Sequence, residues 1–449
     1  MRLKTWAASL AVALSLPFLH GCGNDNANDG SVRIVNATTD YSSIDLYTQD
    51  SDGNNDLVVS GTAAGAVSAY QDIKRGAKTF EVKSGASAGN ASSATGTVTT
   101  GDHFTLVSYI TGNTLDTVFL NEEEKNPSSG NAKLRVLNGA STEAGSVDVY
   151  LSQNACSALS TTDTAFVSAV AAPTAGAGFT TAYSQVTASA AGTTWDLCVT
   201  PTGDKSTVLL DIPKFTLKDQ EIATLILTRT AGGVLLNASL LDQQGALTPF
   251  SNSIARVRVV AAAAAGASAA TASATVNGVS LAGDLVSPAI TSYVAVPSGA
   301  VTGTYAINDT AINGVSLANL SAGSDYTLFV GGDVSAPIVT LIPDNNTPST
   351  SSSTPVEVRV LNGLTNISGG SGTVTVNAGG KQVGSNVAVG AASAYTPIAA
   401  FAGTATVNVS IGGITQPALI NQTFTSGDVY TIFVYGDASS PQIVVNQDH

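Results

Sequence analysis

One unit of about 100 residues recurs four times along the chain. The run VRIVN at residues 32–36 returns as LRVLN at 134–138, VRVV at 257–260 and VRVLN at 358–362, and its arginine recurs at intervals of 102, 123 and 101 residues. Each unit closes with an apolar run whose threonine lies 69 to 89 residues after the arginine. Between these markers stands a tyrosine, at Tyr70, Tyr183, Tyr293 and Tyr395. Three markers in one order predict tandem domains.

Within each unit the hydrophobic pattern is that of short β-strands. Segments 44–47, 147–150 and 373–376 alternate with period two, and Gly or Asn-Gly turn signals separate such runs. We therefore predict an all-β protein with four tandem Ig-like β-sandwich domains, at residues 31–121, 131–242, 254–342 and 356–449. The alanine run 261–265 favours a helix by propensity, but its register with the other units predicts a loop. Polar junctions at 122–130, 242–245 and 343–355 predict an elongated string of domains.

Residues 1–21 have the pattern of an export signal: two early positive charges, then about 14 mostly apolar residues, too few to span a bilayer as a helix. The next motif, Leu19-His20-Gly21-Cys22, resembles the lipobox of bacterial lipoproteins, which implies cleavage before Cys22 and lipidation of its sulfur. Residues 22–30 then form a polar tether. Gly23, where an aspartate would signal retention in the inner membrane, favours a lipid anchor in the outer membrane. The alternative is ordinary secretion with Cys22 as a spare thiol.

Two further cysteines, Cys156 and Cys198, remain as an even pair in an exported chain, so we predict a disulfide between them. It would close a span of 42 residues, worth about 4 kcal/mol in the chain-entropy model. Two buried free thiols and a metal site stay open as alternatives. A metal site would have few partners, because His103 and His449 are the only histidines that follow Cys22.

The first two units resemble the bacterial domain-of-unknown-function family numbered 4397. Its members open with a Val-Arg-Val-x-(His/Asn)-Ala-Ser run followed by Val-Asp-Val-Tyr, and the matching stretches here are 32–37 with 44–47, and 134–141 with 147–151. In the third and fourth units the aspartate of the second run is missing. The resemblance implies the repeated fold and an exported, often lipid-anchored protein. It carries no activity and no catalytic residues.

Candidate catalytic groups are few. His103 stands beside Asp102, but the other units place different residue types nearby, so we expect a structural or surface histidine there and no Ser-His-acid triad. Asp45 and Asp148 occupy equivalent strand positions, and we expect solvent-facing or turn-bonding acids. Paired carboxylates for glycoside hydrolysis stay open as an alternative, since such partners can lie far apart in a sequence.

Two further patterns have a possible binding role. Asp50, Asp52, Asn54 and Asp56 space oxygen side chains as calcium loops do, but glycine stands fourth rather than sixth and Gly61 takes the place of the glutamate of an EF-hand. A polar hairpin insertion is therefore the main interpretation and a weak calcium site the alternative. The repeated arginines could form a ligand row, but we expect them on the outward face of a first strand, where they would protect an edge. They are Arg33, Arg135, Arg258 and Arg359.

Composition narrows the function further. A net charge of −14 with 18 Lys and Arg residues argues against non-specific nucleic-acid binding, and no motif calls for a cofactor. We expect a non-enzymatic, lipid-anchored cell-envelope protein whose domains serve for spacing, display or weak binding of extracellular protein or glycan. The alternative is an extracellular hydrolase acting on polysaccharide. Its site would lie in the second unit, which has the extra length, the cysteines and Trp195.

Overall fold

The structure is a computed structural model that describes residues 29–49, 54–84, 91–112, 114–140, 144–179, 181–188, 194–230, 234–266, 268–347, 355–365, 372–399 and 404–448. Over these residues the chain is all-β, with eight sheets and one short 3-10 helix. Two sheets pack face to face in each of four repeats, which confirms the prediction of tandem β-sandwich domains. Within the described ranges, no helix is long and apolar enough to cross a membrane.

Repeat 1 contains two four-stranded sheets, in the orders β4-β1-β7-β8 and β3-β2-β5-β6. Its strands are β1 (Asp29–Asn36), β2 (Ser43–Gln49), β3 (Asn55–Ala63), β4 (Gln71–Lys74), β5 (Gly76–Lys83), β6 (Ala91–Val98), β7 (His103–Thr111) and β8 (Thr114–Asn121). The apolar residues of β1, β2, β5 and β7 that face the space between these sheets form its core.

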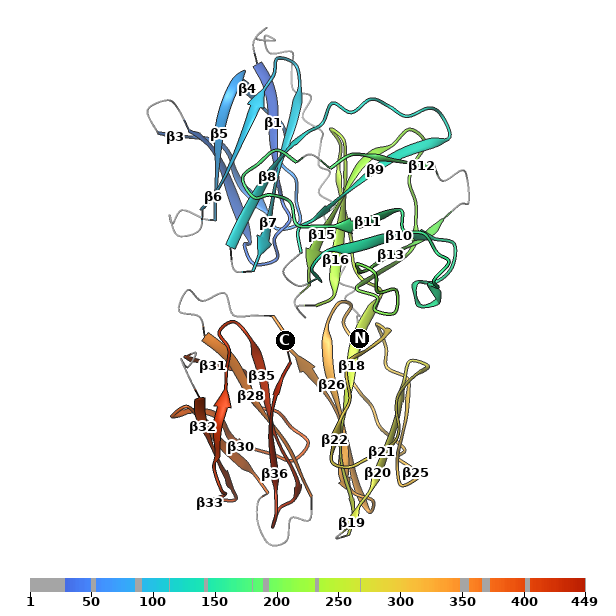
Figure 1. Cartoon of the computed structure of the whole chain (residues 1–449), viewed down its shortest axis with the longest axis vertical. Coiled ribbons are helices and arrows are strands. Elements are labelled where there is room, and N and C mark those ends of the chain that lie inside the picture. The colour runs from blue at the N-terminus through green and yellow to red at the C-terminus, as the bar shows by residue number, and fades with distance from the viewer. Residues whose placement is uncertain are drawn as a thin grey trace, which may run out of the picture.

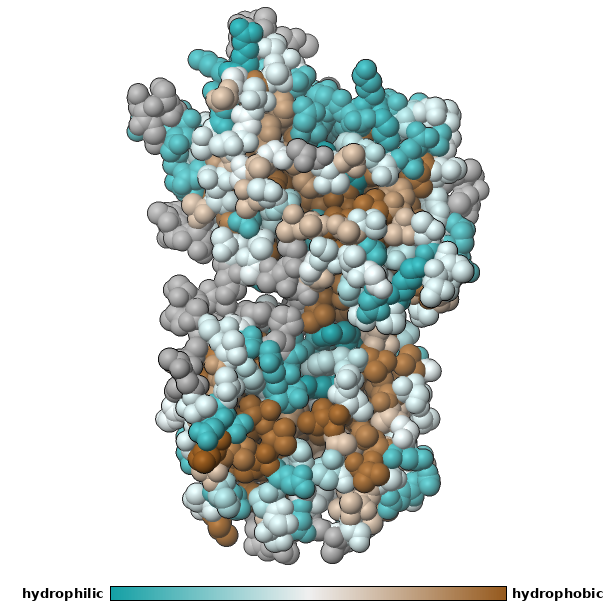
Figure 2. All heavy atoms as spheres, in the orientation of Figure 1, coloured by the Kyte–Doolittle hydropathy of each residue, from teal (hydrophilic) through white to brown (hydrophobic). Residues whose placement is uncertain are grey.

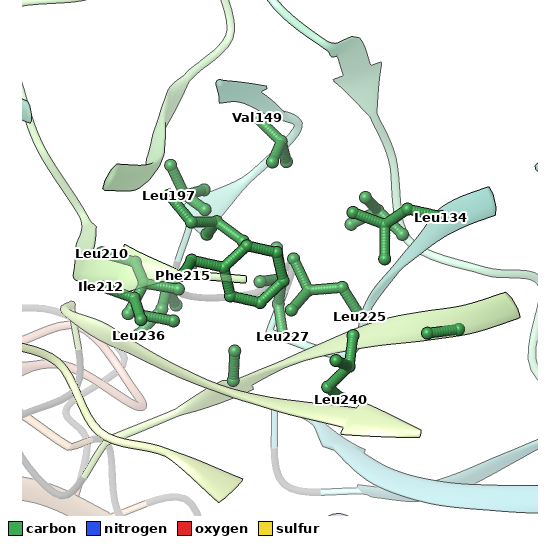
Figure 3. Close-up of a cluster of buried hydrophobic side chains, with 14 of the residues drawn as sticks. Leu134, Val149, Leu197, Leu210, Ile212, Phe215, Leu225, Leu227, Leu236 and Leu240 are labelled. Carbon is green, nitrogen blue, oxygen red and sulfur yellow. The ribbon is translucent and has the colours of Figure 1, made fainter. Parts of the chain in front are cut away.

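Repeat 2 has one sheet in the order β11-β10-β13-β14 and a second in the order β12-β9-β15-β16-β17. Its elements are β9 (Asn131–Asn138), β10 (Val147–Ser152), the 3-10 helix η1 (Cys156–Ala158), β11 (Val167–Val170), β12 (Ser184–Thr187), β13 (Trp195–Pro201), β14 (Leu210–Phe215), β15 (Ile222–Arg229), β16 (Leu236–Asp242) and β17 (Leu247–Phe250). Figure 3 shows its core, where leucines from β9, β13 and β15 surround Phe215.

Repeats 3 and 4 follow the same plan. Repeat 3 comprises β18 (Ile254–Ala265), β19 (Ser268–Ala269), β20 (Thr271–Val276), β21 (Val279–Val286), β22 (Ala289–Ile290), β23 (Val294–Pro297), β24 (Gly303–Ile307), β25 (Thr310–Ala311), β26 (Asp325–Asp333) and β27 (Ala336–Asp344). Repeat 4 comprises β28 (Pro355–Thr365), β29 (Val374–Ala378), β30 (Lys381–Val387), β31 (Thr396–Ala399), β32 (Thr404–Ile411), β33 (Ile414–Thr415), β34 (Leu419–Thr423), β35 (Val429–Asp437) and β36 (Gln442–Gln447).

The first strand of every repeat lies inside its sheet. It pairs in parallel with the closing apolar strand, as β1 with β7, β9 with β15, β18 with β26 and β28 with β35. A short strand covers its other side, β4 in repeat 1 and β12 in repeat 2. The prediction that the repeated arginines protect a sheet edge was therefore wrong, because the strand that carries them has a neighbour on both sides.

The alanine run 261–265 forms the end of β18, so the prediction of a loop was also wrong. It continues in register with β26, and residues 264–265 pair with β19. Ala261, Ala262, Ala263 and Ala264 are 1–4% exposed. Ladder hydrogen bonds on both sides override the helix propensity of alanine, and small side chains leave room for the neighbouring repeat.

The four repeats form two side-by-side pairs, repeats 1 and 2 above repeats 3 and 4 in Figure 1. The expectation of beads on polar linkers was wrong. Residues 242–245 form the turn between β16 and β17 rather than a linker. Between the pairs, the buried Asn252 donates to the carbonyls of Leu209 and Leu236 and accepts from the backbone N–H of Asp211, which fixes the connecting segment on repeat 2. The hydroxyl of Thr230 in repeat 2 donates to the carbonyl of Gly323 in repeat 3 and so joins the two pairs.

A segment of repeat 2, residues 174–179, lies across the sheet edges of repeat 1. The N–H of Thr95 donates to the carbonyl of Gly176, and the N–H of Gly176 donates to the carbonyl of Thr117. The backbones of Phe119 and Phe179 continue the contact, with the N–H of Phe179 donating to the carbonyl of Phe119 at 2.8 Å. This strap ties the two repeats together through backbone hydrogen bonds.

Candidate functional site

The most distinctive polar feature is one arginine cluster in each repeat. Parallel register places the arginine of the first strand opposite the threonine of the closing strand, and its Nε donates to the threonine Oγ1 at 2.8–3.0 Å. The guanidinium also lies 4.4–4.8 Å from the ring of the marker tyrosine. The arginines are only 1–5% exposed, which contradicts the expected outward orientation. They are Arg33, Arg135, Arg258 and Arg359.

In the pair of repeats 3 and 4, the arginines exchange acidic partners. Arg359 of repeat 4 binds Asp344 at the end of β27 at 2.5 Å, and Arg258 of repeat 3 binds Asp448 beyond β36 at 2.6 Å. Asp344 also accepts hydrogen bonds from Thr327 and from Tyr293 of its own repeat. The exchange is reciprocal, like the contacts of a two-fold dimer. Burial and the neighbouring Asp344 raise the pKa of the Tyr293 hydroxyl, so it stays a donor.

In the pair of repeats 1 and 2, the arrangement is asymmetric. Arg33 binds both carboxylate oxygens of Glu122 at 3.0 Å and donates across the pair to the carbonyls of Asp242, at 3.2 Å, and Gly245, at 2.5 Å. Arg135 donates to the carbonyl of Asn121 in repeat 1 at 3.4 Å. Among the described residues it forms no ion pair, unlike the other three arginines.

In the other three repeats the acidic partner lies two residues beyond the residue that pairs with the marker threonine, and in repeat 2 that position holds Gln243. Asp242, one residue earlier, lies near Glu221. Burial, together with the Asp242 carboxyl, raises the pKa of Glu221 to about 7. The two groups line an open hollow of about 250 Å³.

Apolar contacts complete both joins. The residue two positions after each arginine points to the same sheet face and is 0–1% exposed: Val35, Leu137, Val260 and Leu361. Val35 and Leu137 share one apolar cluster between repeats 1 and 2, and Val260 and Leu361 share another between repeats 3 and 4. Figure 2 shows hydrophobic residues crossing the lower half of this face, over the join of repeats 3 and 4.

Small residues allow this close approach. A Cβ at Gly139 would lie 2.9 Å from the carbonyl oxygen of Leu227 and 3.0 Å from Cβ of Tyr109 in repeat 1. At the equivalent position in repeat 4, a Cβ on Gly363 would lie 2.9 Å from Cβ of Ala262. The two joins thus use the same strand positions.

The equivalent aspartates bind backbone bulges. Asp45 accepts from the N–H of Gly61, and Asp148 accepts from the N–H of Ala169, both residues having positive φ. In repeats 3 and 4, hydroxyls of Ser273 and Thr375 accept from the bulge N–H groups of Asp284 and Asn386. The bulge requires a side-chain oxygen as acceptor at this strand position, and a hydroxyl serves as well as a carboxylate. Repeats 3 and 4 therefore do not need the aspartate.

His103 contacts Glu123 rather than Asp102, at 3.0 Å from its Nδ1, and packs against the ring of Tyr70. Of the calcium candidates, Asp50 and Asp52 lie outside the described residues, as does Cys22. Asn54 and Asp56 are exposed at the start of β3. Among the described side chains, no group of three or more His, Cys, Asp or Glu residues could hold a metal ion.

Repeat 2 contains the expected disulfide between Cys156 of η1 and Cys198 of β13. Both cysteines are buried beside Tyr150. Trp195 is 8% exposed and packs in the core of repeat 2 with Leu197 and Phe215, so it is a core residue and not part of a cleft.

The pairing of repeats and the proximity of Glu221 to Asp242 were not predicted from the sequence. A signal for the pairing was present, because the face that carries each arginine also carries an apolar residue two positions later. In a strand with one solvent-exposed face, the residues on that face are mostly polar. An apolar residue on the expected outward face therefore indicates that another surface covers this face.

Comparison with known proteins adds a family and two structures. Residues 30–150 match the family described as "Domain of unknown function (DUF4397)". None of the curated proteins compared with the chain matches it. Two crystal structures are similar at 11% identity: a protein assigned provisionally to cell adhesion from Bacteroides uniformis and a fimbrial assembly protein from Parabacteroides distasonis. They cover 49% of this chain and 99% and 98% of their own, with TM-scores of 0.20 and 0.14, which carry no argument about function.

Proposed function

We propose that the chain is a non-enzymatic protein of the bacterial cell envelope, anchored to the outer membrane by a lipid on Cys22. Its two rigid pairs of β-sandwich repeats would space or display loops for weak binding of an extracellular protein or glycan. The observation that carries this proposal is the use of the buried arginines. Three of them bind an acidic side chain, and two of those ion pairs join neighbouring repeats. The buried arginines, whose desolvation costs the most free energy, therefore hold the repeats together in a rigid array.

The rigid joins support the spacing role. Reciprocal ion pairs, shared apolar clusters and the backbone strap all connect neighbouring repeats. A fixed arrangement of this kind presents its loops at constant distances from one another. Loops on a rigid scaffold lose less entropy when they bind a partner, which suits weak contacts made by many such proteins on one surface.

Fractionation tests the anchor. Cys22→Ser should move the protein from the membrane fraction to the soluble fraction, or leave it unprocessed, and should abolish labelling by a palmitate analogue. Cys156→Ser is the matched control, because it makes the same chemical change in repeat 2 and should leave the protein in the membrane fraction. Wild-type protein that is soluble and unlabelled would contradict the anchor.

A polysaccharide panel tests the non-enzymatic role. The full-length protein should release no reducing ends from acidic or neutral polysaccharides. If reducing ends appear and Glu221→Gln abolishes them, the hydrolase alternative in repeat 2 replaces this proposal.

A further inference from the structure

A cleft between repeats 1 and 2 is lined by a buried arginine, Arg135, that forms no direct ion pair with the described residues. The cleft has a volume of about 390 Å³, and its walls include Asn121 and Glu124 from the end of repeat 1 and Arg135, Phe179 and Tyr183 from repeat 2. A volume of this size accommodates a small molecule such as a monosaccharide.

Arg135 has hydrogen-bonding capacity to spare at this cleft. A guanidinium carries five N–H donors. Towards described residues, Arg135 uses Nε for Thr224 at 2.8 Å and Nη2 for the carbonyl of Asn121 at 3.4 Å, which is long for a hydrogen bond. The rings of Tyr183 and Phe179 lie 4.4 and 5.4 Å from the guanidinium carbon and hold its plane. Burial lowers the pKa of Arg135, as expected for a cation that lacks full compensation.

The other clusters show what such an arginine binds. Arg33 has Glu122, Arg359 has Asp344 and Arg258 has Asp448, each at 2.5–3.0 Å. The corresponding residue of repeat 2 is the neutral Gln243, which binds the backbone of Glu124 instead. Three clusters thus contain an arginine with a carboxylate of the chain, and the fourth contains an arginine that faces a cleft.

We propose that this cleft binds a small carboxylate ligand, with the carboxylate on Arg135 in the manner that the acidic side chains bind the other three arginines. The planar donor fork of arginine matches a carboxylate in a bidentate geometry. Lys133 of the lining is already paired with Glu124. Arg135 is then the cation of the described lining without an ion pair, and its single charge matches a monoanion better than a dianion such as sulfate. Amide, hydroxyl and aromatic groups of the lining suit a hydroxylated ring. A uronic acid combines such a ring with a single carboxylate.

Calorimetric titration of the full-length protein tests this site, with sodium glucuronate and sodium acetate as probes and with glucose and sodium sulfate as comparisons. We expect glucuronate to bind with a dissociation constant on the order of 1 mM, acetate more weakly, sulfate more weakly still, and glucose not at all. Arg135→Gln should weaken glucuronate binding at least tenfold. Glu124→Gln should strengthen it severalfold, because it removes a negative charge from the lining and releases Lys133 from its ion pair.

Two controls keep the test decisive. Arg75→Gln removes an exposed arginine of repeat 1 and should leave binding unchanged. Arg135→Lys keeps the charge and the fold but loses the planar fork, so it should weaken binding severalfold even if Arg135→Gln unfolds the pair, which Trp195 emission would show. No binding by the folded wild-type protein overturns the proposal. Equal binding of glucose and glucuronate, or unchanged binding by Arg135→Lys, overturns it too.

Discussion

Replacing Arg33 with methionine should destabilise both repeats of the first pair, although the change lies in repeat 1. Arg33 is 3% exposed and binds Glu122, Thr105 and two backbone carbonyls of repeat 2. Methionine keeps much of the apolar stem but none of the donors. Glu122, itself 2% exposed, would then lose its ion-pair partner and keep only the hydrogen bond from Tyr70.

Removing one partner of a buried ion pair costs about 3–5 kcal/mol, because the remaining charge stays buried without compensation. The loss of donors to Gly245 and Asp242 adds to this cost wherever water cannot replace them. With a urea dependence of about 2–3 kcal/mol per molar, the unfolding midpoint of the pair should fall by about 1–2 M. The variant that also carries Glu122→Leu should recover most of this loss, since no charge is then left unpaired.

Trp195 makes the measurement specific. The sequence has only one other tryptophan, Trp6, so in a Trp6→Phe background the fluorescence reports the core of repeat 2 alone. Arg75→Met is the matched control, since this arginine is exposed and surface changes usually stay within about 0.5 kcal/mol. If Arg33→Met leaves the urea midpoint of the Trp195 transition unchanged, Arg33 does not couple the stability of repeat 2 to that of repeat 1, and this reasoning is refuted.

Three further predictions concern the same pair of repeats, each followed by Trp195 fluorescence. Gly139→Val should cost at least about 1–3 kcal/mol, because its side chain would meet Tyr109 and the backbone of the neighbouring strand; an unchanged midpoint would contradict the close approach. Cys198→Ser opens a 42-residue span and should cost about 4 kcal/mol, an effect that reduction of the wild-type protein should reproduce. Glu221, with its pKa raised to about 7, keeps a proton in the folded state that the unfolded state has already lost. Stability should therefore fall as pH rises from about 4.5 to 7, and Glu221→Gln should flatten that fall.

The repeat markers predicted more than the fold class. The arginine and threonine that mark each repeat prove to be register partners on neighbouring parallel strands, as Arg33 is with Thr105. Their recurrence in the same order reflects one contact kept in every repeat. The disulfide could also be predicted, because an even pair of cysteines in a chain expected to be exported favours a disulfide.

The pairing of repeats could not be predicted from the same residues. An arginine at an alternate strand position fits an exposed face and a buried ion pair equally well, and the acid that decides between them can belong to another repeat. Asp448 lies 190 residues from Arg258. The raised pKa of Glu221 depends on its burial next to Asp242, which is a property of the folded surroundings and leaves no periodic pattern.

The extra length of repeat 2 explains why the two pairs differ. From Arg135 to Tyr183 the chain runs 48 residues, against 35 to 37 for the same interval in the other repeats. The strap at 174–179 lies within this interval, binds the backbone of repeat 1, and places Phe179 in the wall of the cleft beside Arg135. Repeats 3 and 4 have no such insertion between the same markers, and there two acids neutralise two arginines. The added segment therefore replaces part of the ionic join with backbone contacts, which allows Arg135 to face a cleft while the pair stays closed.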